Sequence, residues 1–277
     1  MKQSKTVAYL GPAGTYSQLA LLNHFGNDIN QCPCLSIDEV FYATEQRLAD
    51  AGIVPVENST EGSVNNTQDL LMDSMLCIVG EEVVPIEHNL LVPVDAPTMK
   101  IHAIASHGQS LAQCRRWINS HYPKAELIEC VSNAEAASRV DAARGVAAIA
   151  GSLAARTYQL AIKMKGIQDQ MHNSTRFLVL GHIPAMATGS DKTTIIVYTE
   201  NRPGALFKVL EPFENLRISL TKIDSRPSKK EAWEYVFFID FEGHQQDINI
   251  AELFERLADC TQQVKVLGSY PVYSGQQ

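Results

Sequence analysis

Apolar and polar residues alternate in blocks along the first half of the chain, with short apolar runs between stretches of helical spacing. In the first such stretch Leu19, Leu22 and Phe25 fall on one face of a helix. The apolar runs are rich in valine, isoleucine and tyrosine, as strands are. This alternation predicts an α/β fold with a mainly parallel sheet. We expect strands at residues 6–10, 34–37 and 53–56, and a second helix at residues 37–48.

The middle of the chain continues the alternation. A long β-rich segment, residues 77–94, is expected to cross into a second lobe. The second lobe is then expected to contain strands at 101–105, 125–131 and 146–150, a helix that carries Leu111, Cys114 and Ile118, a helix at 133–140 and a helix that begins at Ser152. A further strand is expected at 175–180.

The C-terminal part has a different order of elements. Residues 184–191 (PAMATGSD) are small and polar and lack periodicity, so we expect a boundary there. The predicted division is a first domain at 1–184, a linker at 185–191 and a second domain at 192–277. The order βαββαβ predicts a ferredoxin-like second domain. Its elements are expected at 193–199, 204–213, 218–225, 233–241, 250–258 and 264–272.

Small polar residues and glycines gather where predicted strands end. Residues 11–17 (GPAGTYS) follow the first strand, residues 57–63 (ENSTEGS) follow the third, and residues 106–114 (SHGQSLAQC) follow the strand at 101–105. Ser63 is a candidate N-cap for the next helix, and helix N-termini hold anions. Because ligands of open α/β sheets collect at the carboxyl ends of the strands, these loops predict a shared crevice.

Charge limits how that crevice can bind a ligand. The net charge of −8 argues against nucleic acid as a partner. Between Thr6 and Met99, Arg47 is the single Lys or Arg, against thirteen acidic residues. If this region binds an anion, backbone dipoles or an arginine from elsewhere must hold it.

Length and composition indicate a globular protein of two domains. The chain has 277 residues, of which 45% are hydrophobic and 19% are charged. Its apolar runs are too short for a signal peptide or a membrane helix. Cys32 and Cys34, the closest pair of cysteines, lack companion ligands, so we expect reduced thiols and no metal site. The predicted location is the cytoplasm, without a membrane partner.

Several of these segments together resemble the prephenate dehydratase family. They are GPAGTYS (11–17), PVENSTEGSV (55–64), SHGQSLAQC (106–114) and NSTRF (173–177), while GALFKVL (204–210) and DSRP (224–227) resemble the ACT regulatory domain of that family. The resemblance covers nearly the whole chain. It implies two α/β lobes around a cleft, as in type II periplasmic binding proteins, and then the ACT domain. Since it begins at the first dehydratase motif, we expect a monofunctional protein without a chorismate mutase segment.

The resemblance also implies a reaction, the conversion of prephenate to phenylpyruvate, water and carbon dioxide, with no metal or organic cofactor. Thr175 is implied to hydrogen-bond the departing hydroxyl. Arg176 would bind a substrate carboxylate, or point to the opposite face of its strand. Glu57 would orient its neighbour, relay a proton or be structural. Further implied site residues are Asn58, Ser106 and Gln113 around the substrate, the last only if its helix lines the cleft, and Thr15, Ser59, Thr60 and Phe177 as the pocket wall. His88, His107 and His172 are expected to be structural.

The ACT resemblance implies phenylalanine as an effector and a homodimer or homotetramer. Asp224 stands where the family pattern generally has Glu, and Gly108 stands where Pro is common. The first departure leaves the strength of the phenylalanine response open. An arogenate dehydratase and a non-catalytic amino-acid sensor remain alternatives. The implied effector site comprises Asn201, Pro203, Gly204, Ala205, Leu206, Asp224, Ser225, Arg226 and Pro227.

Overall fold

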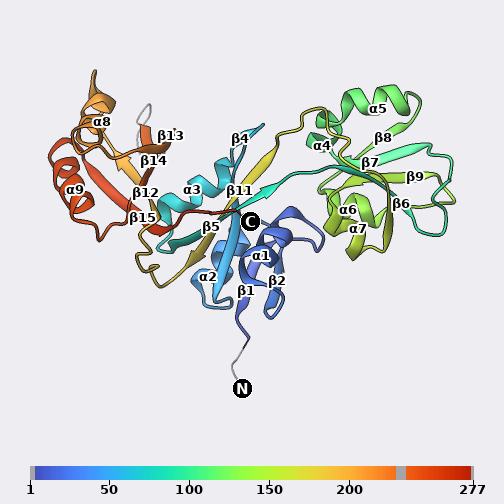
Figure 1. The fold of residues 1–277 in the computed structure, drawn as a ribbon, viewed down its shortest axis with the longest axis horizontal. Helices are drawn as coiled ribbons and strands as arrows, with labels where there is room; N and C mark the ends of the chain where they lie inside the picture. The colour runs from blue at the N-terminus through green and yellow to red at the C-terminus, as the bar shows by residue number, and fades with distance from the viewer. Residues whose placement is uncertain (1–3, 229–234, 276–277) are drawn as a thin grey trace. The chain divides into compact units, whose positions relative to one another are not determined.

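The computed structural model describes residues 4–228 and 235–275. Contacts between residues divide the chain into two compact units. The first unit contains the residues up to 68 together with 82–177, and the second contains 69–81 together with the residues from 178 onward. Figure 1 labels the helices and strands of both units.

The first sheet has the strand order β2-β1-β3-β11-β5, and β1 pairs in parallel with both β2 and β3. This parallel arrangement agrees with the alternation of strand and helix in the sequence. The elements that form this lobe and its sheet are β1 (Thr6–Leu10), α1 (Tyr16–Phe25), β2 (Asn30–Cys34), α2 (Ile37–Glu45), β3 (Ala51–Asn58), β4 (Gly62–Ser63), α3 (Asn65–Asp73), β5 (Cys77–Pro85) and β11 (Ser174–Gly181).

Two details of this lobe differ from the prediction. The strand expected at 34–37 begins four residues earlier, as β2. The pattern missed it because its sequence NQCPC is polar and forms the exposed edge of the sheet. Ser63 is not an N-cap, since it pairs with Glu57 in the short hairpin of β3 and β4, and α3 begins at Asn65.

Helix α1 buries a different face from the one predicted. Ala20 and Leu21 are fully buried, whereas Leu19, Leu22 and Phe25 are half-buried. Because residues 19–22 are all apolar, their spacing alone does not select one face.

The second lobe has the strand order β10-β6-β9-β7-β8, and its parallel part, β8-β7-β9, repeats the order β2-β1-β3 of the first lobe. The helix predicted through Cys114 is two helices, and β10 was not predicted. The elements are β6 (Asn89–Pro93), β7 (Ala103–His107), α4 (Gly108–Gln113), α5 (Arg115–His121), β8 (Glu126–Cys130), α6 (Asn133–Ser138), β9 (Val146–Ala150), α7 (Ser152–Thr157) and β10 (Leu160–Met164).

The C-terminal domain is an antiparallel sheet of order β13-β14-β12-β15, with α8 and α9 packed against it (Figure 1, orange to red). The core between helices and sheet includes Phe213, Phe241 and Leu253. The elements are β12 (Asp191–Tyr198), α8 (Ala205–Asn215), β13 (Leu220–Pro227), β14 (Tyr235–Glu242), α9 (Ile248–Cys260) and β15 (Gln263–Pro271). The predicted start of β14, at residue 233, lies outside the described residues. The α/β class, the two lobes and the βαββαβ domain are therefore confirmed.

Residues 69–81, the end of α3 and most of β5, belong to the same unit as this domain. Lys265 Nζ donates to the carbonyl oxygens of Leu71, Met72 and Ser74 at 2.7–3.0 Å, and so caps the C-terminal end of α3. Arg226 on β13 donates to Asp69 on α3 at 2.7 Å. The C-terminal domain is thus hydrogen-bonded to the helix that follows residues 57–64.

Removing the cation from a buried ion pair in this unit should destabilise it. Lys192 Nζ lies 2.9 Å from a carboxylate oxygen of Glu81, whose side chain is 2% exposed. We expect Lys192→Met to lower the free energy of unfolding by about 3–5 kcal/mol, since a buried carboxylate loses its cation. Adding Glu81→Gln should restore much of the loss. Urea denaturation of the single and double variants measures both effects, and an unchanged Lys192→Met midpoint would contradict the assignment.

Among the helices of residues 4–228 and 235–275, none is long and apolar enough to cross a membrane.

Candidate functional site

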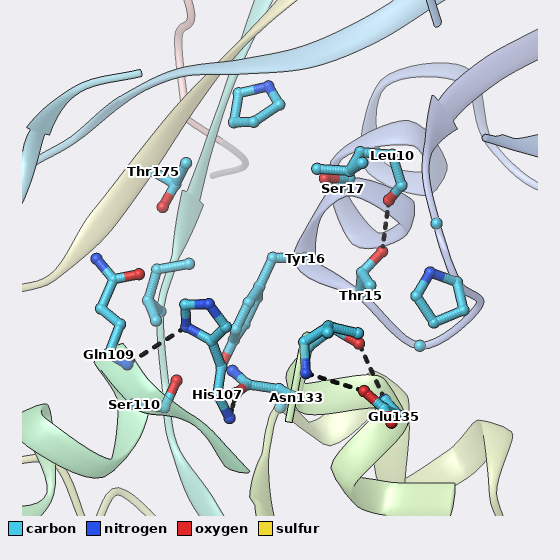
Figure 2. Close-up of a pocket in the computed structure, with 18 of the residues that line it drawn as sticks. Leu10, Thr15, Tyr16, Ser17, His107, Gln109, Ser110, Asn133, Glu135 and Thr175 are labelled. Atoms are coloured by element: carbon cyan, nitrogen blue, oxygen red, sulfur yellow. Dashed lines mark hydrogen bonds between the residues drawn. The ribbon is translucent and has the colours of Figure 1, made fainter. Parts of the chain in front are cut away.

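A cavity of about 710 Å³ lies within the first unit and is lined by residues of both lobes. The whole segment 11–17 contributes to its wall, as do parts of the predicted loops at 57–63 and 106–114. Figure 2 shows Thr175 on one wall, with Gln109, His107 and Asn133 of the second lobe on the other. The structure therefore brings together the polar loops that the sequence placed at the carboxyl ends of strands.

Four helix N-termini lie at the wall of this cavity. The described residues that line it include no Lys or Arg. The N-cap residues of α1, α4, α6 and α7 all line it, namely Thr15, His107, Ser132 and Gly151. Since helix N-termini carry free N–H groups and a partial positive charge, the cavity can hold an anion without a cationic side chain.

Asn58 and Thr175 form the polar centre of one wall. Asn58 lies at the end of β3 and Thr175 near the start of β11, so two strands of one sheet position them. Asn58 Nδ2 donates to Thr175 Oγ1 at 2.8 Å. This bond occupies a lone pair of the hydroxyl, and among the described residues Thr175 has no acceptor for its own proton. The hydroxyl can therefore donate to a ligand in the cavity.

The amide of Asn58 is oriented by the backbone around it. Its Oδ1 accepts the backbone N–H groups of Thr60 and Glu61, at 3.0 and 3.1 Å. Its Nδ2 also donates to Asn173 Oδ1 at 2.9 Å. Asn173 in turn donates to Gln113 Oε1 at 3.1 Å. The helix of Gln113 does line the cavity, as its predicted role required.

Ser106 lies beside the cavity but does not line it. It is fully buried, and its Oγ is 2.9 Å from Asn133 Oδ1 and 2.7 Å from the carbonyl oxygen of Ile149. Asn133 is the residue that reaches the cavity. Asn133 was expected in a helix and without a role at the site, although its position just after the N-cap of α6 is one at which ligand contacts occur.

Arg176 is not among the residues that line the cavity. Its neighbours Thr175 and Phe177 do line the cavity. Because successive side chains of a strand face opposite sides, Arg176 faces the other side of β11. Arg176 Nη1 lies 4.0 Å from Glu57 Oε2, and Glu57 is also absent from the cavity wall. Their proposed roles at the substrate stay predictions.

The remaining predicted wall residues divide into two groups. Thr15 lines the cavity and caps α1, and Phe177 lines it from β11. Ser59 and Thr60 are exposed and do not line it, although Ser59 Oγ accepts the backbone N–H of Ser174 at 2.9 Å. The contacts of Ser59 with Ser174 join the loop after β3 to the start of β11.

Cys34 is a nucleophile by residue type that also lines the cavity. Burial, with Cys32 nearby, raises the pKa of its thiol to about 11. It is therefore protonated near neutral pH and is a poor nucleophile.

A separate pocket of about 410 Å³ lies in the C-terminal domain, at the N-terminal end of α8. Of the predicted effector residues, it is lined by Asn201, Gly204, Ala205, Leu206 and Ser225.

Pro203, Asp224, Arg226 and Pro227 do not line this pocket. On β13, Ser225 faces the pocket, and Arg226 instead binds Asp69. The wall also contains six residues that were not predicted, namely Thr199, Glu200, Arg202, Phe207, Tyr235 and Phe237.

Two α/β lobes form a cavity lined by amides and helix N-termini, and a small domain with its own pocket follows. The class is therefore a two-lobed α/β fold with a ligand-sized cavity and an appended domain. The family model described as prephenate dehydratase matches residues 7–185, and that of the ACT domain matches residues 193–259. The chain therefore belongs to the prephenate dehydratase family and carries an ACT domain. The family predicted from the sequence is confirmed.

Relatives and solved structures that are similar to this chain also include prephenate dehydratases. The bifunctional chorismate mutase/prephenate dehydratase of Pseudomonas aeruginosa is 48% identical over 98% of this chain and 74% of its own length. The prephenate dehydratase of Methanocaldococcus jannaschii is 35% identical over 98% of this chain and 99% of its own. The crystal structure of prephenate dehydratase from Arthrobacter aurescens in complex with L-Phe has a TM-score of 0.87 and 33% identity, covering 96% of this chain and 90% of that one.

Proposed function

We propose that this protein converts prephenate to phenylpyruvate in phenylalanine synthesis. The bond between the ring and its carboxylate breaks, and the electron pair moves through the ring to expel the hydroxyl on the opposite carbon. That hydroxide takes up a proton and leaves as water, carbon dioxide departs, and the ring becomes aromatic. Because aromatisation drives the step, the protein has to position the substrate, stabilise the leaving oxygen and remove water from one carboxylate.

The hydroxyl of Thr175 is the observation that carries this proposal. Its oxygen is held by Asn58 at 2.8 Å, and its proton is available to a ligand in the cavity. A hydrogen bond from it to the departing oxygen strengthens as negative charge develops there, which is how a weak acid assists without a matched pKa. The N-termini of the surrounding helices would bind the substrate carboxylates.

The test is to mix purified protein with prephenate and to follow phenylpyruvate. Turnover of prephenate supports the proposal, and no product rejects it. Arogenate, which differs in its aminated side chain, is the alternative substrate. The two substrates share the leaving hydroxyl and the ring carboxylate, so a difference in kcat/KM between them reports the preference for the side chain. The substrate with the higher kcat/KM is the preferred one.

The pocket at α8 is the proposed site of the effector phenylalanine, with the amino acid's carboxylate at the backbone N–H groups near Gly204. The resemblance to the ACT domains of the family implies binding between two subunits, so the proposal includes a homodimer or homotetramer, in the cytoplasm. Ser225 lines the pocket and the next residue, Arg226, binds Asp69 of α3. A shift of β13 on ligand binding would therefore reach α3, which gives the two sites a route for linkage.

Breaking that contact should weaken inhibition more than catalysis. In Asp69→Asn the bond to Arg226 loses its charge, and we expect prephenate turnover close to wild type but a higher phenylalanine concentration for half-inhibition, by about three- to tenfold. Calorimetry should show phenylalanine still binding. Unchanged inhibition would show that linkage does not pass through this pair. Glu252→Gln, which removes an exposed ion pair on α9, is the matched control.

A further inference from the structure

A chain of hydrogen bonds joins the hydroxyl of Thr175 to a buried imidazole. It runs from Thr175 to Asn58, Asn173, Gln113 and His88, with donor–acceptor distances of 2.8, 2.9, 3.1 and 2.8 Å. All five residues line the cavity. In each of the three amides, both the oxygen and the nitrogen have a hydrogen-bond partner.

Backbone groups at one end set the direction of every bond in this chain. Thr60 and Glu61 donate their backbone N–H groups to Asn58, so Oδ1 of Asn58 must be the acceptor and Nδ2 the donor. Asn173 Oδ1 then accepts, which leaves its Nδ2 to donate to Gln113 Oε1. With Oε1 an acceptor, Gln113 Nε2 points toward Glu61, whose carboxylate is 3.3 Å away. The imidazole nitrogen beside Gln113 Oε1 has to be a donor.

His88 therefore has the tautomer with hydrogen on Nε2. The side chain is 2% exposed, and Nδ1 has no partner among the described residues and exposes less than 1 Å². The ring of Tyr16 packs edge-on against it at 6.3 Å. Burial lowers the pKa of His88, which keeps it neutral. Because Nδ1 is enclosed, it is not placed to take a proton from a ligand.

We propose that His88 is a positioning residue for the reaction proposed above. Its Nε2–H donates to Gln113 Oε1 beside Asn173 Nδ2, and so holds in place the end of the chain that lies farthest from the backbone groups at Asn58. The Thr175 proton then faces the substrate. Without the donor at residue 88, Gln113 Oε1 keeps the bond from Asn173 but loses the one from the imidazole, so the amides of Gln113 and Asn173 are held less rigidly behind Asn58 and Thr175.

A matched pair of variants tests the role of the donor. Gln places an N–H close to the position of Nε2, and Met has the same length without a donor. We expect His88→Met to lower kcat about tenfold with little change in KM, and His88→Gln to stay within about threefold of wild type. Equal losses in both variants, or no loss in His88→Met, would overturn the proposal.

Two further measurements separate this role from a general effect on folding. In a Gln113→Ala background, His88→Met should cost nothing more, whereas independent losses would show that His88 does not act through Gln113. Nitrogen-15 NMR of the wild-type protein should show His88 protonated on Nε2 alone, and a proton on Nδ1 would reject the network. The NMR result holds whatever the substrate is, so failure of prephenate turnover would count against the proposed function and not against this chain of bonds.

Discussion

Replacing Thr175 by Val is expected to lower kcat for prephenate by about 10²–10³-fold, the cost of removing one donor to a developing oxyanion. Valine keeps the shape of threonine and its β-branching, so β11 and the cavity wall should remain intact. KM should change little, because the lost hydrogen bond strengthens only as the hydroxyl leaves. Steady-state rates of phenylpyruvate formation measure the effect.

Further substitutions at the same position identify the hydroxyl as the cause. Thr175→Ala should be as inactive as the valine variant and should melt near the wild-type temperature. Thr175→Ser keeps the hydroxyl but frees its rotation, so it should retain part of the activity. Near-wild-type turnover in Thr175→Val or Thr175→Ala would reject the assignment, and an inactive serine variant would indicate that the methyl group matters as much as the hydroxyl.

The elements that the sequence predicted well are those with long apolar runs. β9 lies at the predicted residues, and its five residues are all buried, so composition alone identifies it. β2 was misplaced because an edge strand buries little and NQCPC has no apolar run. The grouping of residues 69–81 with the C-terminal domain was not predictable, since it depends on contacts such as that of Asp69 with Arg226 across 157 positions.

The sequence predicted several residues of the candidate site but not the hydrogen bonds that connect them. Asn58, Gln113 and Thr175 were named from the sequence, and the structure places them in one chain of hydrogen bonds. Asn173 joins Asn58 to Gln113 but was given no role. A carboxamide just before a strand can bond backbone, side chain or ligand, and the sequence does not distinguish these. Arg176 was expected either to bind a substrate carboxylate or to point to the opposite face of its strand, and the cavity wall includes its neighbours Thr175 and Phe177 but not Arg176.

The absence of Lys and Arg from the described cavity wall has a consequence for the chemistry. A cation beside the ring carboxylate would stabilise the group that has to lose its charge as carbon dioxide forms. Helix N-termini and amides bind an anion with smaller partial charges, which leaves the carboxylate less stabilised in the ground state. The described wall contains the carboxylate of Glu135 and no Lys or Arg, so it has no cationic side chain to offset a further negative charge.

Asn58→Asp is therefore expected to be the most damaging isosteric change, with a loss in kcat/KM of about 10³-fold or more. A like charge about 4 Å from a carboxylate costs about 4 kcal/mol near a protein surface. The carboxylate also cannot donate to Thr175, and would instead accept the Thr175 proton that the substrate needs. The backbone N–H groups of Thr60 and Glu61 remain satisfied, so the loop should keep its conformation.

Asn173→Asp is the matched control, because it adds the same charge one step further along the chain while Oδ1 can still accept from Asn58. Its loss should lie between wild type and Asn58→Asp. If the two variants lose equally, charge alone explains the effect and the donor role of Asn58 is rejected. If Asn58→Asp turns over prephenate like wild type, neither the charge argument nor the orientation of the Thr175 proton can stand. The kinetics of both variants have to be measured at one ionic strength. Salt screens the added charge but does not change the loss of the donor, so a difference in ionic strength would alter the comparison of the two variants.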